Sequence, residues 1–475
     1  MTLVMKFGGT SVGSAQAMRE TADLIQNCLA DWGQVVVVAS AMGTKPVKVT
    51  DLLLQGANTA AAGDGTTYLQ TAADLRQIHH QTINDLLADS PEQEAVTADI
   101  ERFIERFEDL CRAVLVLGEL SPRALDAIGG MGEQMSVRLL AAYLRHIGQP
   151  AEAIDATELI VTDDVFLSAT PLMAATTEKV EGRIRPLLAQ NIIPIITGFI
   201  GATADGVTTT LGRGGSDFSG AILGQALAAA EVWIWTDVDG VMSADPRLVE
   251  TARSISRLTY REVSELAYYG ARVLHPKTMR PCISHNIPLR IKNTFNPDHP
   301  GTVIVPDEQA VNGGIKAVTA IENLSLVTIE GKGMIGVPGI AARAFGAVAR
   351  TNVSVLLISQ ASSEQSICFA APEAATDGVI AALEEAFAEE LTRQDIDSIW
   401  AWRPVSIVTI VGAGMRGTPG IAGRIFTALG ENQVNVVAIA QGSSECSISL
   451  VADAEDTAVA VSHIHNLIVT TSKSG

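Results

Sequence analysis

The sequence predicts an α/β fold with an open, mostly parallel sheet sandwiched by helices, followed by two small α+β units. Three observations lead to this prediction. Apolar strand candidates alternate with helical stretches from residue 1 to about residue 300. A polar segment rich in Pro, Gly, Asp and Asn follows at 293–314, and beyond it residues 327–367 recur as residues 408–448.

Length and composition limit the functional classes. A chain of 475 residues exceeds one ordinary hydrophobic core, so we expect two to four domains. The net charge of −20 argues against a nucleic-acid or anionic-membrane partner, since phosphate binding at scale needs surplus Lys and Arg. The five cysteines are scattered without a CxxC pair, which favours reduced thiols over a disulfide frame or a zinc site. Because no apolar run approaches ~20 residues and the start lacks a signal peptide, we expect a cytoplasmic protein with no membrane span.

The α/β pattern can be followed element by element. Long apolar runs with β-branched residues predict strands, and their lack of alternation predicts burial on both faces. The strand candidates are Thr2–Phe7, Gln34–Ser40, Ala151–Asp155, Ile192–Ile196, Glu231–Thr236 and Pro288–Lys292, and the helical stretches include Ala15–Leu29, Ala95–Val116 and Glu133–His146. Several strands end in clusters of Gly, Ser, Thr or Asp, where open α/β sheets usually bind ligands.

The repeat carries a glycine pattern that has two interpretations. Gly331-x-Gly333-x-x-Gly336 recurs as Gly412-x-Gly414-x-x-Gly417, in each case between a strand and a helix. This spacing is found in dinucleotide-binding sites, which would indicate a nicotinamide dehydrogenase. Such a site also needs an acidic residue about 20 residues later, whereas the following strands end in Gln360 and Gln441. The duplication therefore favours two copies of a strand–turn–helix unit.

Two glycine-rich clusters in the first part of the chain are suited to anions. Lys6-Phe7-Gly8-Gly9 follows a strand and precedes a helix, so its backbone N–H groups and its Lys can cradle phosphate oxygens; the alternative is an ordinary turn. In Gly212-Arg213-Gly214-Gly215-Ser216-Asp217 the Arg can grip a carboxylate with two hydrogen bonds, although Ser216 or Asp217 could simply cap a helix.

Three further clusters carry charged or titratable groups. Asp237 and Asp239 at a strand end could hold a metal-bound nucleotide or a ribose, or form an Asp-Gly turn. His275 is expected to be a structural hydrogen-bonding residue, whereas Lys277 could lie near a transferred phosphate. Glu133 could bind a ligand ammonium or interact with a helix dipole.

Taken in order, these motifs resemble those of aspartate kinases of the amino-acid kinase superfamily. The matching segments are KFGGTS (6–11), SAMG (40–43), VTD (49–51), GE (132–133), GRGGSD (212–217), TDVDGV (236–241), DPR (245–247) and HPKT (275–278). The repeats resemble the paired ACT domains that follow the kinase in that family. The resemblance implies a catalytic domain with the amino-acid kinase fold over residues 1–300 and two βαββαβ, ferredoxin-like ACT domains over 315–390 and 400–475.

The resemblance also implies an activity. It is the ATP-dependent phosphorylation of the L-aspartate β-carboxylate to 4-phospho-L-aspartate, which begins lysine, methionine and threonine biosynthesis, with Mg²⁺ bound to ATP and no separate protein metal site. The implied catalytic residues are Lys6, Gly8, Gly9, Asp217 and Lys277, with Asp217 orienting Lys6. The implied aspartate-binding residues are Ser40, Thr50, Glu133 (amine), Arg213 (α-carboxylate) and Ser216. The implied nucleotide-binding residues are Lys6, Gly8, Gly9, Thr236, Asp237, Met242, Arg247 and Lys277.

The sequence departs from the family pattern at two places near this site. Position 242 is Met where family members often carry Tyr, which alters the expected nucleotide contact. The segment Ser40–Thr50 is longer than usual, so Thr44 is an alternative to Thr50.

For the C-terminal part, the resemblance implies feedback regulation by a small amino acid. The implied effector contacts are Met334, Gly336, Val337, Pro338, Gly339, Ile340, Asn352, Val353 and Gln360, with Ser362–Glu364 nearby; the alternative is that these residues only build turns. The run ISQASSEQSI resembles the threonine-sensitive branch, and Leu356 stands where lysine-binding members tend to have an acidic residue, so we favour threonine over lysine. That branch is often fused to homoserine dehydrogenase; because the sequence ends at Gly475, we expect no dehydrogenase domain.

Paired ACT domains also imply a homodimer or homotetramer. Two further functions are alternatives besides the dehydrogenase. One is a catalytically silent, amino-acid-sensing protein, against which the intact Lys6, Glu133, Arg213 and Lys277 argue. The other is a related kinase acting on another amino-acid carboxylate.

Overall fold

The computed structural model describes residues 1–43, 48–271, 274–307, 314–334, 337–360, 365–415, 417–442 and 446–471. The chain forms two compact units, which are described separately. The first unit comprises Met1–Val241, Ser256–Tyr260 and Leu274–Pro306, and the second comprises Met242–Ile255, Arg261–Val273 and Asp307–Gly475. The units therefore do not follow the boundary expected near residue 300, because residues 242–255 and 261–273 belong to the second unit.

The first unit is built on an eight-stranded sheet with the order β3-β5-β2-β1-β8-β10-β11-β9. The strands from β3 to β10 are parallel to their neighbours, and β11 is antiparallel to β10. The predicted parallel sheet is thus confirmed, with strand ends within a residue of the predicted ones. The strands are β1 (Thr2–Phe7), β2 (Gln34–Ala39), β3 (Ala151–Ile154), β5 (Ile193–Thr197), β8 (Glu231–Thr236), β9 (Arg257–Thr259), β10 (Leu289–Asn293) and β11 (Thr302–Val305). A small sheet beside it contains β4 (Val161–Thr162), β6 (Ile200–Thr203) and β7 (Thr208–Thr210).

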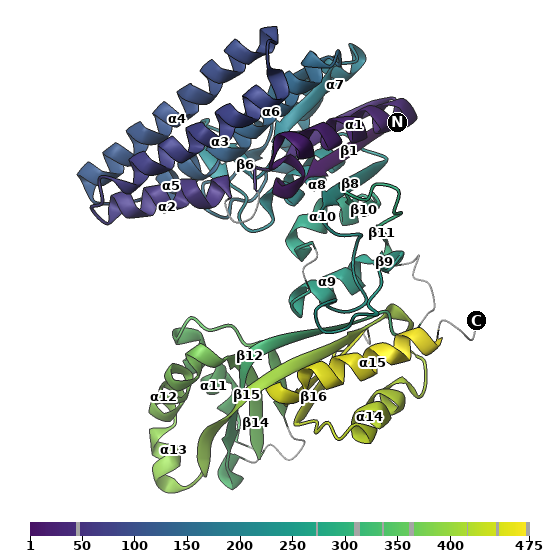
Figure 1. The fold of residues 1–475 in the computed structure, drawn as a ribbon. Helices are drawn as coiled ribbons and strands as arrows, with labels where there is room; N and C mark the ends of the chain where they lie inside the picture. The colour runs from purple at the N-terminus through teal and green to yellow at the C-terminus, as the bar shows by residue number, and fades with distance from the viewer. Residues whose placement is uncertain are drawn as a thin grey trace. The chain divides into compact units, whose positions relative to one another are not determined.

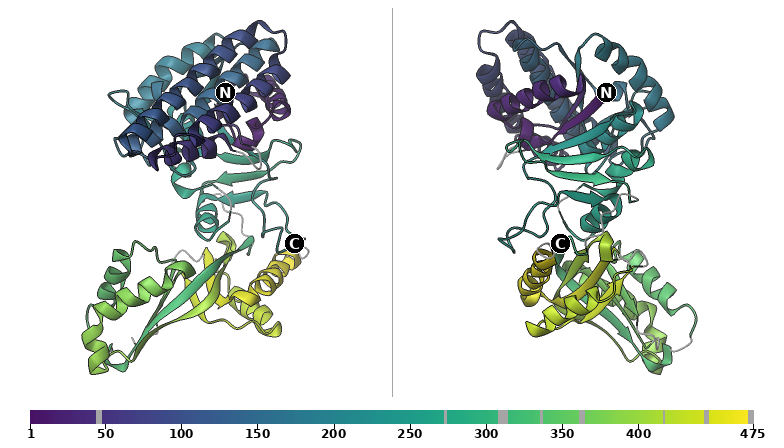
Figure 2. Two further views of the ribbon diagram at one scale, coloured as in Figure 1. Left: turned by 60° about the vertical axis from the view of Figure 1, so that its left-hand side comes forward. Right: turned by 90° about the vertical axis from the view of Figure 1, so that its right-hand side faces the viewer.

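Helices cover both faces of this sheet (Figures 1 and 2). Alternate residues of β1 face opposite sides, so Leu3, Met5 and Phe7 join the core formed with the N-terminal helices, while Lys6 faces α8. Figure 1 shows α3, α4 and α6 lying side by side. The helices are α1 (Ala15–Trp32), α2 (Val49–Ala61), α3 (Thr67–Leu87), α4 (Pro91–Leu117), α5 (Pro122–Gly129), α6 (Met131–His146), α7 (Met173–Ala189), α8 (Gly215–Ala226) and α10 (Pro276–Ser284). Among the helices of the described residues, none is both long enough and apolar enough to cross a membrane.

Two glycines let α8 lie close to the sheet. A Cβ at Gly220 would come within 3.3 Å of the Lys6 Cβ, and one at Gly224 within 2.4 Å of a Val232 methyl group. The helix therefore packs with its backbone almost against β1 and β8, and its first turn reaches the end of β1.

The second unit contains one six-stranded antiparallel sheet with the order β13-β14-β12-β15-β17-β16. Each repeat supplies a long strand, a glycine-rich turn, a helix and a hairpin, as the sequence predicts. The first repeat has β12 (Ala317–Glu330), α11 (Ile340–Arg350), β13 (Leu357–Gln360), β14 (Ser366–Pro372), α12 (Thr376–Ala386) and α13 (Ala388–Arg393). The second has β15 (Ser398–Val411), α14 (Ile421–Glu431), β16 (Ala438–Gln441), β17 (Ser447–Asp453) and α15 (Thr457–Thr471).

The two long strands are shared between the repeats. The end of β12, from Leu324, pairs with β14 of its own repeat, while its beginning pairs with the end of β15. Equivalent backbone bonds recur 81 residues apart: the Lys316 N–H donates to the Val411 carbonyl at 2.9 Å, and the Asp397 N–H donates to the Glu330 carbonyl at 2.8 Å. The repeats are therefore interlocked into one sheet, because each half of this sheet contains one half of β12 and one half of β15.

Helix α9 (Tyr260–Tyr268) is held within the second unit by buried carboxylates. Glu262 is fully buried, with one oxygen 2.9 Å from the Lys316 ammonium and the other accepting the Ala413 N–H at 2.6 Å. One turn further along, Glu265 accepts a hydrogen bond from the Ser447 hydroxyl at 2.8 Å. Lys316 directly precedes β12 of the first repeat, Ala413 lies in the glycine loop of the second repeat, and Ser447 begins β17 of the second repeat.

Residues 242–255 are held in the same unit. The Ser243 hydroxyl lies 2.9 Å from the buried His465 Nε2, and the Ser243 carbonyl accepts the Val318 N–H at 2.9 Å. Ala244 and Val249 pack into the apolar core of the second repeat. Two segments from the middle of the chain are therefore structural parts of this repeat.

We expect Lys316→Met to destabilise the protein by about 3 kcal/mol, because it leaves the buried Glu262 carboxylate without its cation. The double variant Glu262→Gln/Lys316→Met should recover most of this loss, since it removes both charges together. Urea unfolding of the three proteins measures the effect. Arg393→Met is the matched control, because its ion pairs are exposed and long, and it should change the free energy of unfolding by less than about 1 kcal/mol. A single variant as stable as the wild type would contradict the role given to this pair.

Candidate functional site

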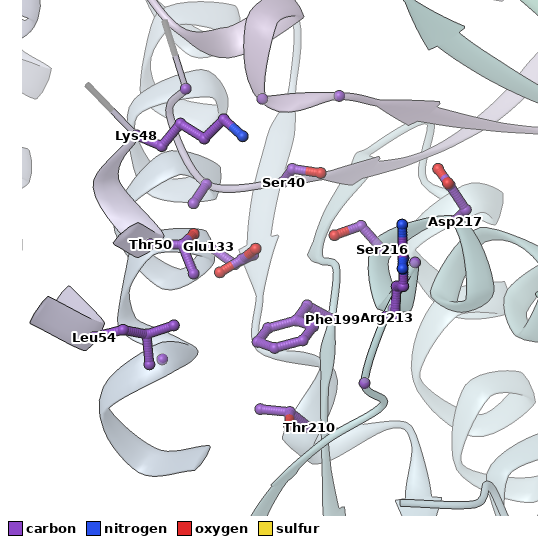
Figure 3. A pocket seen from close by; sticks show the side chains of 18 of the residues that line it. Ser40, Lys48, Thr50, Leu54, Glu133, Phe199, Thr210, Arg213, Ser216 and Asp217 are labelled. Atoms are coloured by element: carbon purple, nitrogen blue, oxygen red, sulfur yellow. The ribbon is translucent and has the colours of Figure 1, made fainter. Parts of the chain in front are cut away.

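A pocket of about 790 Å³ opens where β1, β2, β5 and β8 of the first unit end. Side chains from the carboxyl ends of parallel strands converge there, as expected for an open α/β sheet. Figure 3 shows the side chains that line this pocket. The predicted residues among them are Lys6, Gly8, Gly9, Ser40, Thr50, Glu133, Arg213, Ser216, Asp217, Thr236 and Asp237.

Lys6 and Asp217 form an ion pair in the wall of the pocket. Lys6 is the penultimate residue of β1, and Asp217 lies in the first turn of α8. Their side chains meet at 2.6 Å, with the Lys6 side chain 10% exposed and that of Asp217 21% exposed. Because the carboxylate holds the ammonium group in one position, Lys6 presents a fixed positive charge to the pocket.

Gly8 and Gly9 come two and three residues after Lys6 and form a part of the pocket wall that has no side chains. The Gly8 N–H donates to the Trp235 carbonyl at 3.0 Å, and the Gly9 carbonyl accepts the Gly43 N–H at 3.0 Å. A Cβ at Gly9 would lie 2.9 Å from the Ala41 carbonyl oxygen. Glycine is required at position 9 because three chain segments meet there, and an anion can approach the backbone closely.

Glu133 lies deep in the pocket, in the first turn of α6. A Cβ at Gly132 would come within 2.7 Å of the Ala41 Cβ, so the glycine lets α6 approach the end of β2. Glu133 is only 4% exposed, and within the described structure its Oε2 has no hydrogen-bond partner. Burial raises the pKa of the Glu133 carboxyl to about 8, an effect only partly offset by the backbone N–H groups of Ala41 and Glu133 and by the charge of Lys6. A carboxyl in this state is suited to a ligand that brings a positive charge.

Arg213 faces Glu133 from the opposite side of the pocket (Figure 3). It is exposed, and both glycines beside it have left-handed backbones, with φ of 76° at Gly212 and 72° at Gly214. In the part of the chain that the structure describes, no carboxylate forms an ion pair with Arg213. The guanidinium is therefore held at the pocket with its hydrogen-bonding fork available to an anionic ligand.

The end of β8 supplies Thr236 and Asp237 to the pocket. The Thr236 hydroxyl lies 3.2 Å from an Asp237 carboxylate oxygen. Asp239 does not line the pocket; it accepts hydrogen bonds from the side-chain amides of Asn293 and Asn296 at 2.8 and 3.0 Å. The carboxylate of Asp239 therefore holds neighbouring side chains in place and does not face the pocket.

Three predicted nucleotide or catalytic residues lie outside this lining. The Lys277 ammonium is 3.5 Å from the Ser168 hydroxyl and 5.7 Å from the centre of the Phe218 ring. His275 caps α10 by accepting the Lys277 N–H, which confirms its structural role. Met242 and Arg247 belong to the second unit, where Arg247 pairs with Asp245 at 2.5 Å. Thr44, the alternative to Thr50, lies outside the described residues.

The pocket also contains residues that the sequence did not single out. Lys48 lies directly before the predicted VTD segment, and its basic side chain is the one feature of the sequence that could have indicated a place in an anion-binding pocket. Thr210 precedes the Gly212–Asp217 segment in the same cluster of the sequence, whereas the others carry no motif and reach the pocket only through folding: Leu54, Asn58, Leu125, Asp126, Gly129, Leu167 and Phe199.

The predicted effector residues fall into separate places within the first repeat. Val337, Pro338, Gly339 and Ile340 lead into α11, and Met334 is buried just before them. Asn352 and Val353 follow the other end of α11, a helix of 11 residues and so about 16 Å long. Gln360 ends β13, while Gly336 and Ser362–Glu364 lie outside the described residues. One chain thus presents two groups of these residues at opposite ends of a helix.

No group of three His, Cys, Asp or Glu side chains within the described ranges is arranged to hold a metal ion. At the pocket, Asp217 is paired with Lys6, and the carboxylate of Asp237 follows the end of β8. This donor set fits a cation that arrives coordinated by phosphate oxygens, because Mg²⁺ is usually held by one or two carboxylates plus substrate phosphates.

Comparison with known proteins gives consistent matches over the whole chain. The amino acid kinase family matches residues 1–293, and the ACT domain matches residues 327–387 and 408–467. Aspartokinase 2, chloroplastic, of Arabidopsis thaliana is 34% identical over 475 residues, covering 98% of this chain and 84% of that protein. The bifunctional aspartokinase/homoserine dehydrogenase 2 of the same plant is 37% identical over 471 residues, covering 98% of this chain and 50% of that protein. The chain spans about half the length of the bifunctional plant relatives that it matches.

Solved structures of Escherichia coli aspartokinase III are similar to the chain. In complex with aspartate and ADP, that enzyme gives a TM-score of 0.78 at 29% identity, covering 98% of this chain and 99% of that one. In complex with lysine and aspartate it also gives 0.78, at 30% identity and with the same coverage. With its glycine-lined pocket, its parallel sheet and its two interlocked repeats, the chain belongs to the aspartokinases of the amino acid kinase family that carry C-terminal ACT domains.

Proposed function

We propose that the chain catalyses the ATP-dependent phosphorylation of the L-aspartate β-carboxylate, giving 4-phospho-L-aspartate and ADP. The observation that carries this proposal is the pairing of Lys6 with Asp217 beside the Gly8–Gly9 turn. The same pocket holds the buried Glu133 and Arg213, which forms an ion pair with no carboxylate among the described residues. Aspartokinase relatives, and a related enzyme that binds aspartate and ADP, support it.

The opposing charges of the pocket match the α-carboxylate and the α-ammonium group of an amino acid. Arg213 would bind the α-carboxylate through two parallel hydrogen bonds, and Glu133 would receive the ammonium group. Ser40, Thr50 and Ser216 lie between or beside these two groups and would complete the polar contacts (Figure 3). The β-carboxylate is then left to point towards Lys6 and the glycine turn.

The chemistry needs no general base. An aspartate side chain has a pKa near 4 and is ionised at neutral pH, so its β-carboxylate is already a nucleophile. The β-carboxylate oxygen attacks the γ-phosphorus of ATP, the bond to the β–γ bridging oxygen breaks, and ADP leaves. Lys6 and the backbone N–H groups near Gly8 and Gly9 would neutralise charge on the transferring phosphoryl group. Lys277 is proposed to act on the same group, and Thr236 and Asp237 are proposed to contact the nucleotide.

A divalent cation, proposed to be Mg²⁺, would accompany ATP. Asp237 is the side chain best placed to share it with the phosphates, since the carboxylate of Asp217 is engaged by Lys6. When bound, the cation would supply neutralisation of phosphate charge.

The first repeat is proposed to bind an amino-acid effector that regulates the kinase, with threonine favoured over lysine. The loop before α11 is exposed at Val337, Pro338 and Gly339, and lysine binds the related Escherichia coli enzyme. Because Asn352 and Val353 lie at the other end of α11, one effector could touch both groups only if a second chain contributed one of them. A homodimer or homotetramer formed through the ACT domains is therefore part of this proposal.

Lys6→Met should lower turnover by at least about 100-fold, because the fixed charge beside the transferring phosphoryl group is lost. ADP release from ATP and Mg²⁺, with and without L-aspartate, measures this. The exposed Lys179→Met serves as the matched control and should retain wild-type turnover. Well-folded wild-type protein without aspartate-dependent turnover would refute the proposed function itself.

Glu133 should make aspartate binding depend on pH. Its carboxyl is neutral below a pKa of about 8, so the KM for aspartate should fall as the pH rises from 6 to 8 and then level off. Glu133→Gln should raise the KM and remove this dependence. In the ligand-free protein the same raised pKa lowers the stability of the fold progressively from about pH 4.5 to pH 8, because the unfolded carboxyl ionises and the folded one does not, and the loss persists at higher pH. Thermal unfolding should therefore show that the variant gains stability over the wild type as the pH rises from 5 to 8.5.

Val337→Glu should abolish regulation without altering basal turnover, because it introduces a charge into the exposed loop before α11. Inhibition by L-threonine and L-lysine, together with calorimetric binding of each, measures the effect. The matched control Val459→Glu alters a similarly exposed valine of the second repeat and should leave inhibition intact. Equal inhibition of both variants and the wild type would exclude this loop as the effector site.

A further inference from the structure

Asp126 is a fully buried carboxylate that the proposed mechanism does not use. It lies in α5, seven residues before Glu133, and lines the same pocket. It forms no ion pair with any cation in the described ranges; instead its two oxygens accept hydrogen bonds from neutral groups. A buried charge is costly unless it is well satisfied, so the groups that satisfy it are firmly held.

The donors come from two segments that are remote in sequence. Oδ2 accepts the Thr210 and Leu167 N–H groups, each at 3.0 Å, while Oδ1 accepts the Thr210 hydroxyl at 2.6 Å. A longer contact of 3.2 Å joins Oδ1 to the Leu167 N–H. One carboxylate therefore ties together α5, the end of β7 and the loop around residue 167.

Each of these segments leads to a group that would bind substrate. Residue 210 ends β7, and Gly212 and Arg213 follow directly. Leu167 has an unusual left-handed backbone, with φ of 68°, and its carbonyl oxygen lies 3.0 Å from where a Cβ of Gly212 would be. The Leu167 backbone thus braces the turn that carries Arg213, and Asp126 holds that backbone in place.

On the other side, Asp126 is coupled to Glu133 through the helix junction. The Asp126 carbonyl accepts the Gly130 N–H at 3.3 Å, and α6 begins at the next residue. A Cβ at Gly130 would lie 2.5 Å from a methyl group of Ile200, so this junction has little freedom to shift. The position of α5 therefore determines where Glu133 stands.

We propose that Asp126 is a positioning residue that fixes where Arg213 and Glu133 hold the α-carboxylate and the ammonium group relative to Lys6, and thereby selects an amino acid with the length of aspartate. This inference rests on the proposed function, since it assigns the α-carboxylate to Arg213 and the ammonium group to Glu133. Both residues face the pocket from opposite sides, with Phe199 and Thr210 nearby (Figure 3). A substrate longer by one methylene, such as L-glutamate, would then place its distal carboxylate wrongly with respect to Lys6.

The test compares Asp126→Ala, Asp126→Asn and Thr210→Val with the wild type. The KM for L-aspartate should rise about 10-fold or more in Asp126→Ala, while the KM for ATP changes less than about 2-fold. The ratio of kcat/KM for L-aspartate to that for L-glutamate should fall by about 10-fold or more. Asp126→Asn should recover much of both values, because its amide oxygen can accept the backbone N–H groups and its NH₂ can donate to the Thr210 hydroxyl. Thr210→Val removes one of the donors and should give a smaller change in the same direction.

The matched control is Asp64→Ala. Asp64 likewise accepts two backbone N–H groups and the hydroxyls of Thr66 and Thr67, but it caps α3 away from the pocket. Its loss should affect thermal stability and leave both KM values and the substrate ratio unchanged.

The possible outcomes separate this inference from the proposed function. A purely structural role for Asp126 predicts a smaller active fraction, with lower kcat and unchanged KM values and substrate ratio, and that result would overturn the inference. If Asp126→Ala does not fold, Asp126→Asn and Thr210→Val decide, and wild-type KM and substrate ratio in both would equally overturn it. Calorimetric binding of L-aspartate, without ATP, should show the same weakening. Wild-type protein that phosphorylates neither amino acid would refute the proposed function instead.

Discussion

The close approach of two helices to the central sheet is the constraint on which the site depends. Gly220 and Gly224 bring α8 onto β1 and β8, and Gly132 brings α6 onto the end of β2. The first contact places Asp217 beside Lys6, and the second places Glu133 beneath the pocket. A Cβ at Gly132 or Gly224 would lie 2.7 or 2.4 Å from a neighbouring side chain and force the helix away from the sheet, so packing and the geometry of the charged groups are set by the same contacts.

The pocket concentrates cationic groups within an acidic protein. The chain carries a net charge of −20, yet Lys6, Lys48 and Arg213 all line this one cavity. The acidic groups of the pocket are stabilised in different ways. Asp217 is paired with Lys6, Asp126 is satisfied by hydrogen-bond donors, and the raised pKa of Glu133 keeps that carboxyl neutral at pH 7 in the absence of a cationic ligand. The pocket therefore attracts anions while the acidic surface elsewhere disfavours non-specific polyanion binding.

The two repeats share a fold but use their glycine loops differently. In the second repeat, the Ala413 N–H is taken by Glu262, and Gly414 is buried. At the equivalent positions of the first repeat, Lys332 and Gly333 are exposed. The second loop anchors α9, whereas the corresponding loop of the first repeat is exposed at Lys332 and Gly333. This division arose from a few side chains on α9 and could not be inferred from the alignment of the repeats, in which both loops look alike.

The sequence by itself determined six of the eight strands of the main sheet, their parallel arrangement, the repeat and most residues of the pocket, because hydrophobic periodicity and glycine-rich turns are local signals. It also indicated the Lys, Arg and Glu of the site through motifs at strand ends. Only the tertiary structure decided that β9 and β11 extend the main sheet, that residues 242–255 and 261–273 join the second unit, that the repeats share β12 and β15 in one sheet, and that Asp126 and Phe199 reach the pocket. These features depend on contacts between residues far apart in the chain. Neither composition nor motif spacing indicates which distant residues a buried carboxylate or a long strand will contact.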